Sequence, residues 1–304
     1  METAPEPITV LAVGGTGESY PGDARTHVTG MLAAVTDRLD DRFAARWVGY
    51  PASYGPTAGR HGLAYVDSVA FGVGRLASAI RETDGPVMLI GYSQGAAVIR
   101  TLLSHPSAAR LVDQVASVGF VADPNQPPGV IDGCLGWGVA GPGAPLPGDV
   151  PACWVGAADD MICNATEDSL IRDIADLTDS LSVSHVRRWM SAMRGAVLSD
   201  RMQNAARTSV SPSQWRRDLH RLGNAARELR GYLPPQIRIG SRPILNRGGG
   251  RHVSYAEEPY RHAPLTDPDT TGCEYLAEWM QVQVTMGERL ESHNSGERRL
   301  QPAS

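Results

Sequence analysis

The sequence contains no lysine, so all 28 of its basic residues are arginine. It also has only three phenylalanines and four cysteines in 304 residues, and its formal net charge is −5 at pH 7. Four cysteines are too few for a disulfide scaffold, and a net negative charge gives no indication of nucleic-acid binding. Alanine, glycine, proline and valine are plentiful. Together with the missing lysine, this composition is typical of a very GC-rich genome.

Long hydrophobic runs are missing as well. No apolar stretch approaches the roughly 18 residues that a transmembrane helix needs, and residues 1–7 lack the basic region, apolar core and cleavage site of a secretory signal. We therefore expect no transmembrane segment, and either a cytosolic protein or one that reaches its target without a signal of its own. Metal-ligand spacings such as H-E-x-x-H are also missing, so we expect neither a metal nor another cofactor.

The most informative stretch is Val87–Gly95, in which an apolar strand runs into Gly91-Tyr-Ser-Gln-Gly95 and then into an apolar helix. A G-x-S-x-G motif between strand and helix is typical of a nucleophile elbow, a tight turn that lifts a serine hydroxyl clear of a sheet. The first N–H groups of the following helix then point to the place where an oxyanion forms. The stretch predicts Ser93 as a nucleophile and the Gln94 N–H as an oxyanion donor.

Apolar strands alternate with helical patterns along the first half of the chain. The predicted strands begin near residues 8, 45, 87, 115 and 152, and helices are expected at 24–40, 65–80 and after Ser93. This alternation predicts an α/β fold with a largely parallel central sheet and helices on both faces. From about residue 166 to residue 235 the pattern is helical without strands, and Ser211 and Pro212 mark the start of a well-capped helix.

The pattern divides the chain into three parts. Residues 1–165 and 236–292 are expected to form a catalytic α/β domain, residues 166–235 a helical insertion, and residues 293–304 a disordered tail. Residues 165–250 carry 14 arginines against 8 acidic residues, which suits an anionic or amphiphilic surface. The sequence leaves open whether this insertion or the Gly/Pro-rich loop at 126–150 gates the site.

A serine nucleophile needs a base and a carboxylate that orients the base. In α/β hydrolases the chain order is serine, acid, histidine. Asp159 and Asp160 follow the strand at 152–155 and are the main acid candidates, while Asp123 follows the strand next after the nucleophile. His252 and His262 both precede the last helix, and the neighbouring glycines and tyrosine favour His252.

Gly14-Gly-Thr-Gly-Glu18 follows the first strand and matches no phosphate-binding pattern. In an α/β hydrolase the same position supplies N–H groups to the oxyanion hole. The turn therefore predicts that the Thr16 N–H lies opposite the Gln94 N–H around one carbonyl oxygen.

Four motifs together resemble the cutinase-like serine esterases: Gly14-Gly-Thr-Gly-Glu18, Gly91-Tyr-Ser-Gln-Gly95, Asp160-Met-Ile-Cys163 and His252-Val-Ser-Tyr255. The resemblance covers residues 8–165 and 250–290. It implies a cutinase-like α/β-hydrolase fold with Ser93, Asp160 and His252 as the catalytic triad, and so favours Asp160 over Asp159. It also implies a disulfide between Cys153 and Cys163 beside the acid, although their spacing is wider than in cutinases.

The helical insertion between acid and base is not found in plain cutinases, and it resembles the linker domain of the mycobacteriophage lysin B enzymes. Those enzymes are mycolylarabinogalactan esterases, which detach the outer membrane of the host at lysis. The resemblance implies a phage enzyme, made in the host cytoplasm, that hydrolyses a lipid ester at the surface of the bacterial cell envelope. The alternatives are a general cutinase-like esterase or lipase and a wall-binding protein without activity.

Overall fold

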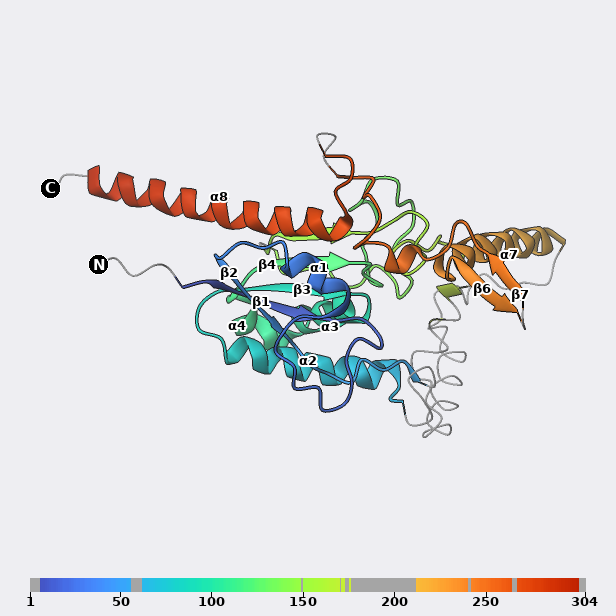
Figure 1. Ribbon diagram of the computed structural model, residues 1–304, viewed down its shortest axis with the longest axis horizontal. Helices are drawn as coiled ribbons and strands as arrows, with labels where there is room; N and C mark the ends of the chain where they lie inside the picture. The colour runs from blue at the N-terminus through green and yellow to red at the C-terminus, as the bar shows by residue number, and fades with distance from the viewer. Residues whose placement is uncertain are drawn as a thin grey trace.

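Five parallel strands form one sheet in the order β2-β1-β3-β4-β5 (Figure 1). The computed structural model describes residues 6–55, 62–148, 150–169, 171–172, 175, 212–239, 242–263 and 267–300. The strands are β1 (Ile8–Val13), β2 (Phe43–Trp47), β3 (Val87–Tyr92), β4 (Val115–Val121) and β5 (Ala152–Val155). The predicted α/β fold with a parallel central sheet is therefore confirmed, and β3, which leads to Ser93, is the middle strand.

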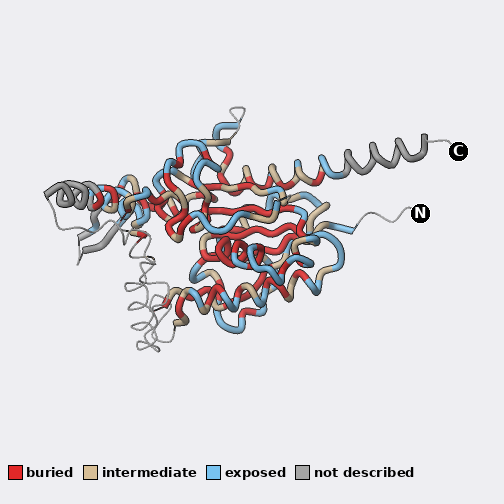
Figure 2. Tube along the Cα trace, turned by 180° about the vertical axis from the view of Figure 1, so that it is seen from behind, coloured by how far each residue is buried: buried red, intermediate tan, exposed pale blue. Residues whose placement is uncertain are grey.

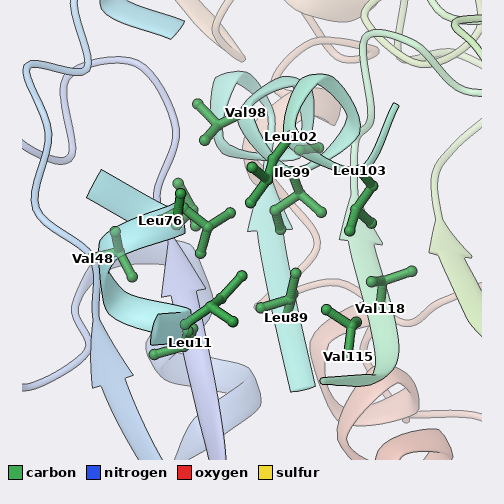
Figure 3. Close-up of a cluster of buried hydrophobic side chains, with 14 of the residues drawn as sticks. Leu11, Val48, Leu76, Leu89, Val98, Ile99, Leu102, Leu103, Val115 and Val118 are labelled. Atoms are coloured by element: carbon green, nitrogen blue, oxygen red, sulfur yellow. The ribbon is translucent and has the colours of Figure 1, made fainter. Parts of the chain in front are cut away.

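Helices cover both faces of the sheet because successive residues of a strand point to opposite sides. Leu11 and Leu89 pack in one buried cluster with α2 (Tyr65–Arg81) and α3 (Gln94–Leu103) (Figure 3). Val10 and Met88, one residue earlier on the same strands, pack with α1 (Ala33–Thr36) and α8 (Gly272–Leu300). Figure 2 shows the resulting buried layers on the two sides of the sheet.

Most predicted elements of the α/β part form within a few residues of the expected places. The helix expected at 24–40 is much shorter, with only η1 (Gly30–Leu32) and α1. Gly30 has φ 66°, a left-handed conformation that no helix interior contains, so α1 begins after it. Two short turns, η3 (Pro106–Ala108) and α4 (Ala109–Val112), connect α3 to β4.

The C-terminal segment differs from its prediction. Disorder is predicted from residue 293, whereas α8 continues to Leu300. The first proline after the start of α8 is Pro302, so no missing N–H interrupts the helix before that point. None of the described helices is long and apolar enough to span a membrane.

The insertion ends with α7 (Pro212–Tyr232), and a separate antiparallel hairpin of β6 (Gln236–Ile239) and β7 (Arg242–Leu245) follows it. The helix predicted at Pro212 forms, whereas the predictions for residues 176–211 lie outside the described residues. The hairpin belongs to neither the central sheet nor the helical pattern that the sequence indicates. The division of the chain into three parts stays a prediction.

The Gly/Pro-rich loop after β4 is held by two buried arginines. The Arg172 guanidinium is fully buried, lies 4.4 Å from the Trp137 ring centroid and donates to four carbonyl oxygens. Those carbonyls belong to Trp137, Gly138, Ala165 and Thr166. Arg100 donates to the carbonyls of Asn125, Pro142 and Ala144. The loop is therefore ordered and lies beside the segment that carries Asp160.

Candidate active site

Ser93 lies in the turn between β3 and α3, with φ 51° and ψ −116°. A non-glycine residue with positive φ is strained and persists only where the surrounding structure holds it. The two glycines of the motif make room for the turn. A Cβ on Gly91 would lie 2.7 Å from the Ala96 nitrogen, and one on Gly95 would lie 1.9 Å from the Val13 oxygen. Sterics therefore require glycine on both sides of the serine.

The His252 imidazole connects the serine to a carboxylate. Its Nε2 is 2.9 Å from Ser93 Oγ, and its Nδ1 is 3.0 Å from Asp160 Oδ2. His252 lies in η6 (Arg251–Val253), ahead of α8, and Asp160 follows β5. With a hydrogen on Nδ1 directed at the carboxylate, Nε2 can accept the serine proton. The chain has an α/β-hydrolase fold.

Asp160 is fully buried and keeps its charge through its neighbours. It accepts hydrogen bonds from the Tyr255 hydroxyl at 2.7 Å and from the Ile162 N–H at 3.0 Å. Burial alone would raise the pKa of this carboxyl, but His252, Tyr255 and the Ile162 N–H hold the pKa below its usual range. A carboxylate that stays ionised can stabilise an imidazolium next to it.

Tyr255 contacts Asp160, although the sequence motifs assign no role to this residue. Its hydroxyl also accepts a hydrogen bond from the Ala157 N–H at 3.1 Å, and burial raises its pKa well above 10, so it stays a donor to Asp160. The signal in the sequence was its place three residues after His252. Nothing in the residues themselves indicated that its partner is the acid.

The other candidate residues have different surroundings. The Asp159 side chain is 60% exposed, with one oxygen 3.2 Å from Arg251. Asp123 is buried away from the histidine and accepts a hydrogen bond from Trp154 Nε1. The His262 ring packs edge-on against Tyr260, with centroids 5.2 Å apart. Of these candidates, Asp160 and His252 are the two whose side chains lie within hydrogen-bond distance of each other, and their catalytic roles stay a prediction.

The motif residue Tyr92 supports the histidine from β3. Its hydroxyl donates to the His252 carbonyl oxygen at 2.8 Å. Its ring stacks on the imidazole, with centroids 5.2 Å apart and an interplanar angle of 28°. Tyr92 is thus a second aromatic residue of the site, after Tyr255, to which the sequence motifs assign no role.

The turn after β1 lies against the nucleophile. A Cβ on Gly15 would lie 2.7 Å from the Tyr92 ring and 3.3 Å from Ser93 Cβ. The Gly15 N–H donates to Glu18 Oε2 at 2.7 Å, and the Gly17 N–H donates to the Ala52 oxygen at 2.8 Å. This leaves the turn anchored on both sides of Thr16.

The two predicted oxyanion donors remain available in this arrangement. Gln94 is the first residue of α3, and the first N–H groups of a helix have no acceptor within the helix. Thr16 is exposed, and its N–H donates to no acceptor within the described part of the chain. Their roles as oxyanion donors stay a prediction.

The predicted disulfide does not form, because all four cysteines are free and buried. Cys153 lies in β5 and packs in the cluster beneath α8. Cys163 Sγ instead lies 3.6 Å from the Asp160 carbonyl oxygen and 3.7 Å from the Tyr255 hydroxyl. Burial raises the pKa of both thiols, that of Cys153 to about 12. The implied pairing was wrong because the two side chains are buried among different partners.

A cavity of about 120 Å³ is lined by Asp159, Arg251 and Tyr255, which are close in sequence to Asp160 and His252. Ser93 is not among its lining residues, so it is not the substrate cleft. Within the described ranges, no group of three His, Cys, Asp or Glu side chains could hold a metal ion.

Known proteins are similar in sequence to the part of this chain around the elbow. A family described as "PE-PPE domain" matches residues 42–139. The SL1278 acyltransferase Chp1 of Mycobacterium tuberculosis (strain ATCC 25618 / H37Rv) is 37% identical over 124 residues. That stretch is 40% of this chain and 27% of the relative, so the match spans about a quarter of the relative's length.

Solved structures of esterases are similar at low identity. An acetyl xylan esterase is 17% identical with a TM-score of 0.42, and the match covers 66% of this chain and all of that one. A cutinase-like protein from Cryptococcus sp. is 16% identical with a TM-score of 0.36, covering 63% and 94%. A Trichoderma reesei cutinase is 18% identical with a TM-score of 0.32, covering 62% and 75%.

Proposed function

We propose that this protein is a serine esterase of the cutinase-like type, with Ser93, His252 and Asp160 as its triad. The observation that carries the proposal is the imidazole within hydrogen-bond distance of both the serine hydroxyl and a buried carboxylate. A strained serine between a strand and a helix N-terminus adds to it. This combination activates a hydroxyl that is otherwise a weak nucleophile.

In the proposed reaction, Ser93 attacks the ester carbonyl while His252 takes the hydroxyl proton. Asp160 holds the imidazole and stabilises its cation. The Thr16 and Gln94 N–H groups donate to the oxyanion, and one such donor typically lowers the barrier by ~2.7–4 kcal/mol. His252 then protonates the departing alkoxide, and water, activated by the same base, releases the acid from Ser93.

We propose a lipid ester as the substrate, specifically the ester between mycolic acids and arabinogalactan of the mycobacterial-type envelope. An exposed apolar side chain beside the base supports a lipid, because Val253, next to His252, is 59% exposed. The relative from a mycobacterium and the lysine-free composition support the setting. In this proposal the enzyme is made in the host cytoplasm and acts at the host envelope during phage-induced lysis.

The test compares wild type with Ser93→Ala on purified mycolylarabinogalactan–peptidoglycan and measures released mycolic acid. Ser104→Ala, at the exposed other end of α3, is the matched control. We expect release by wild type and by the control but not by Ser93→Ala. If none releases mycolic acid while wild type hydrolyses p-nitrophenyl butyrate, the substrate is wrong and a general cutinase-like esterase remains. Turnover by Ser93→Ala would exclude the mechanism.

Transfer of the acyl group to an acceptor hydroxyl other than water is a second candidate, because the curated relative is named an acyltransferase. The acyl-enzyme is the same, and only the nucleophile that resolves it differs. A p-nitrophenyl ester assay with increasing glucose separates the two. Hydrolysis predicts free fatty acid at every glucose concentration, whereas transfer predicts glucose ester in its place.

A further inference from the structure

A second tyrosine ring contacts the catalytic histidine, and it comes from the insertion. The Tyr232 ring centroid lies 5.6 Å from that of His252, with an interplanar angle of 39°. Tyr232 is the last residue of α7, and it is 40% exposed. No motif in the sequence connects this residue with the triad, because 20 positions and a β-hairpin separate it from His252.

The end of α7 packs closely against the loop after β5 that carries Asp159 and Asp160. Gly231 is buried, and a Cβ at this position would lie 2.1 Å from the Asp159 carbonyl oxygen, so only glycine allows this approach. One turn earlier, Glu228 accepts hydrogen bonds from the Thr166 N–H at 2.9 Å and from the Ser169 hydroxyl. The helix end therefore contacts Asp159, which precedes Asp160, and also Thr166 and Ser169, which follow it.

The same helix end also contacts residues 246–250, the loop that leads to His252. Asn246 Nδ2 donates to the Arg230 carbonyl oxygen at 2.7 Å and to that of Leu233 at 3.2 Å, which caps the last turn of α7. The Gly250 N–H donates to the Leu233 oxygen at 2.8 Å. A Cβ on Gly249 would lie 2.1 Å from that oxygen. The glycines before His252 thus serve close packing against α7.

We propose that Tyr232 is a positioning residue for His252, supplied by the helical insertion to hold the imidazole between Ser93 and Asp160. This inference rests on the proposed function, because it concerns the proposed base. Burial and the nearby Asp160 raise the pKa of Tyr232, so its ring is a neutral phenol. An aromatic ring next to a cation stabilises it, and His252 becomes cationic when it takes the serine proton. The contact therefore favours the charged transition state over the resting enzyme.

The first test measures kcat and KM on p-nitrophenyl butyrate and the rate of Ser93 labelling by a fluorophosphonate. Tyr232→Ala and Tyr232→Leu, which keeps an apolar side chain without a ring, should lower kcat and the labelling rate about 3- to 10-fold, the scale of one aromatic contact. KM and the melting temperature should not change. Tyr232→Phe, which keeps the ring, should behave as wild type.

Leu229→Ala is the matched control, because Leu229 lies one turn earlier on α7 and is 41% exposed. It should leave the labelling rate unchanged. Equal labelling of wild type, Tyr232→Ala and Tyr232→Leu would overturn the inference while leaving the esterase proposal intact. An equal loss in Leu229→Ala or in Tyr232→Phe would also overturn it. If wild type itself is not labelled, the proposed function fails, and this inference fails with it.

A double-mutant cycle tests whether the contacts that hold the end of α7 in place affect His252 through the Tyr232 ring. Asn246→Ala removes the cap of the helix end and should slow labelling when Tyr232 is present. In a Tyr232→Ala background the same change should have little further effect, because coupled residues are not additive. Full additivity of the two losses would show that the helix end does not act on His252 through Tyr232.

Discussion

Asp123 and Asp160 follow neighbouring strands of the same sheet, and both are fully buried. Their surroundings nevertheless shift the pKa values of the two carboxyls in opposite directions. Asp123 accepts hydrogen bonds from the Asn125 N–H and from Trp154 Nε1, and its nearest cation, Arg100, is 3.8 Å away. Burial raises the pKa of Asp123. The pKa of Asp160 is lowered by its closer contacts with His252 and a tyrosine hydroxyl.

The difference lies in the partner of each carboxylate. Arginine stays charged throughout the working pH range and cannot relay a proton, so the Asp123 pair can only hold the loop after β4 in place. Histidine changes charge near neutral pH. The Asp160 carboxylate can therefore stabilise the positive charge that a histidine base acquires during a reaction. Burial at a strand end is thus common to a structural aspartate and to the proposed catalytic aspartate.

The largest effect is expected for Asp160→Asn. The amide keeps the shape of the side chain but cannot hold the imidazole in the required tautomer, which in a serine triad costs about 10⁴ in kcat. Ester hydrolysis by purified protein, with the melting temperature as a control of folding, measures this. Activity within an order of magnitude of wild type would mean that another carboxylate orients His252.

Asp123→Asn should change stability and leave kcat unchanged. Removing one partner of a buried ion pair leaves Arg100 without its counter-charge, which typically costs about 3–5 kcal/mol of unfolding free energy. Urea unfolding gives the stability, and titration of reactive Ser93 normalises kcat to the folded fraction. A loss of kcat per reactive serine would contradict the purely structural role.

Tyr255→Phe should have an intermediate effect. A hydrogen bond to a charged group contributes about 1.5–3 kcal/mol, and its loss should lower stability within that range and kcat by less than in Asp160→Asn. Because the hydroxyl lowers the pKa of Asp160, its removal should raise that pKa, and the stability that the ionised carboxylate contributes should be lost at a higher pH on acidification. An unchanged pH dependence of urea unfolding on the acidic side would show that Tyr255 does not set the charge of Asp160.

Asp159→Asn is the matched control for Asp160→Asn and should have the smallest effect. Its side chain is mostly exposed and pairs with Arg251, which also pairs with Glu258. Exposed pairs contribute about 0–1 kcal/mol, so kcat and urea unfolding should both stay close to wild type. A large loss of kcat would mean that the two neighbouring aspartates share the role of acid.

Prediction from sequence was most successful where residues close together in the chain determine the local structure. The strands before Ser93 and Asp160 are apolar runs, and the elbow depends on glycines two residues to either side of the serine. The helix predicted at 24–40 was too long because the left-handed conformation of Gly30 depends on its surroundings. The disulfide was wrong because a resemblance in spacing does not decide which side chains meet.

The α/β class, the nucleophile elbow and a short set of candidate acids and bases follow from the amino-acid sequence alone, because strand periodicity and steric turns are properties of neighbouring residues. Which of the candidates meet depends on how the chain folds in three dimensions. His252 is 159 residues from Ser93 and 92 from Asp160. Contacts over such separations, including those of Tyr255 and Tyr232, arise when the sheet brings strand ends together and the insertion packs against them.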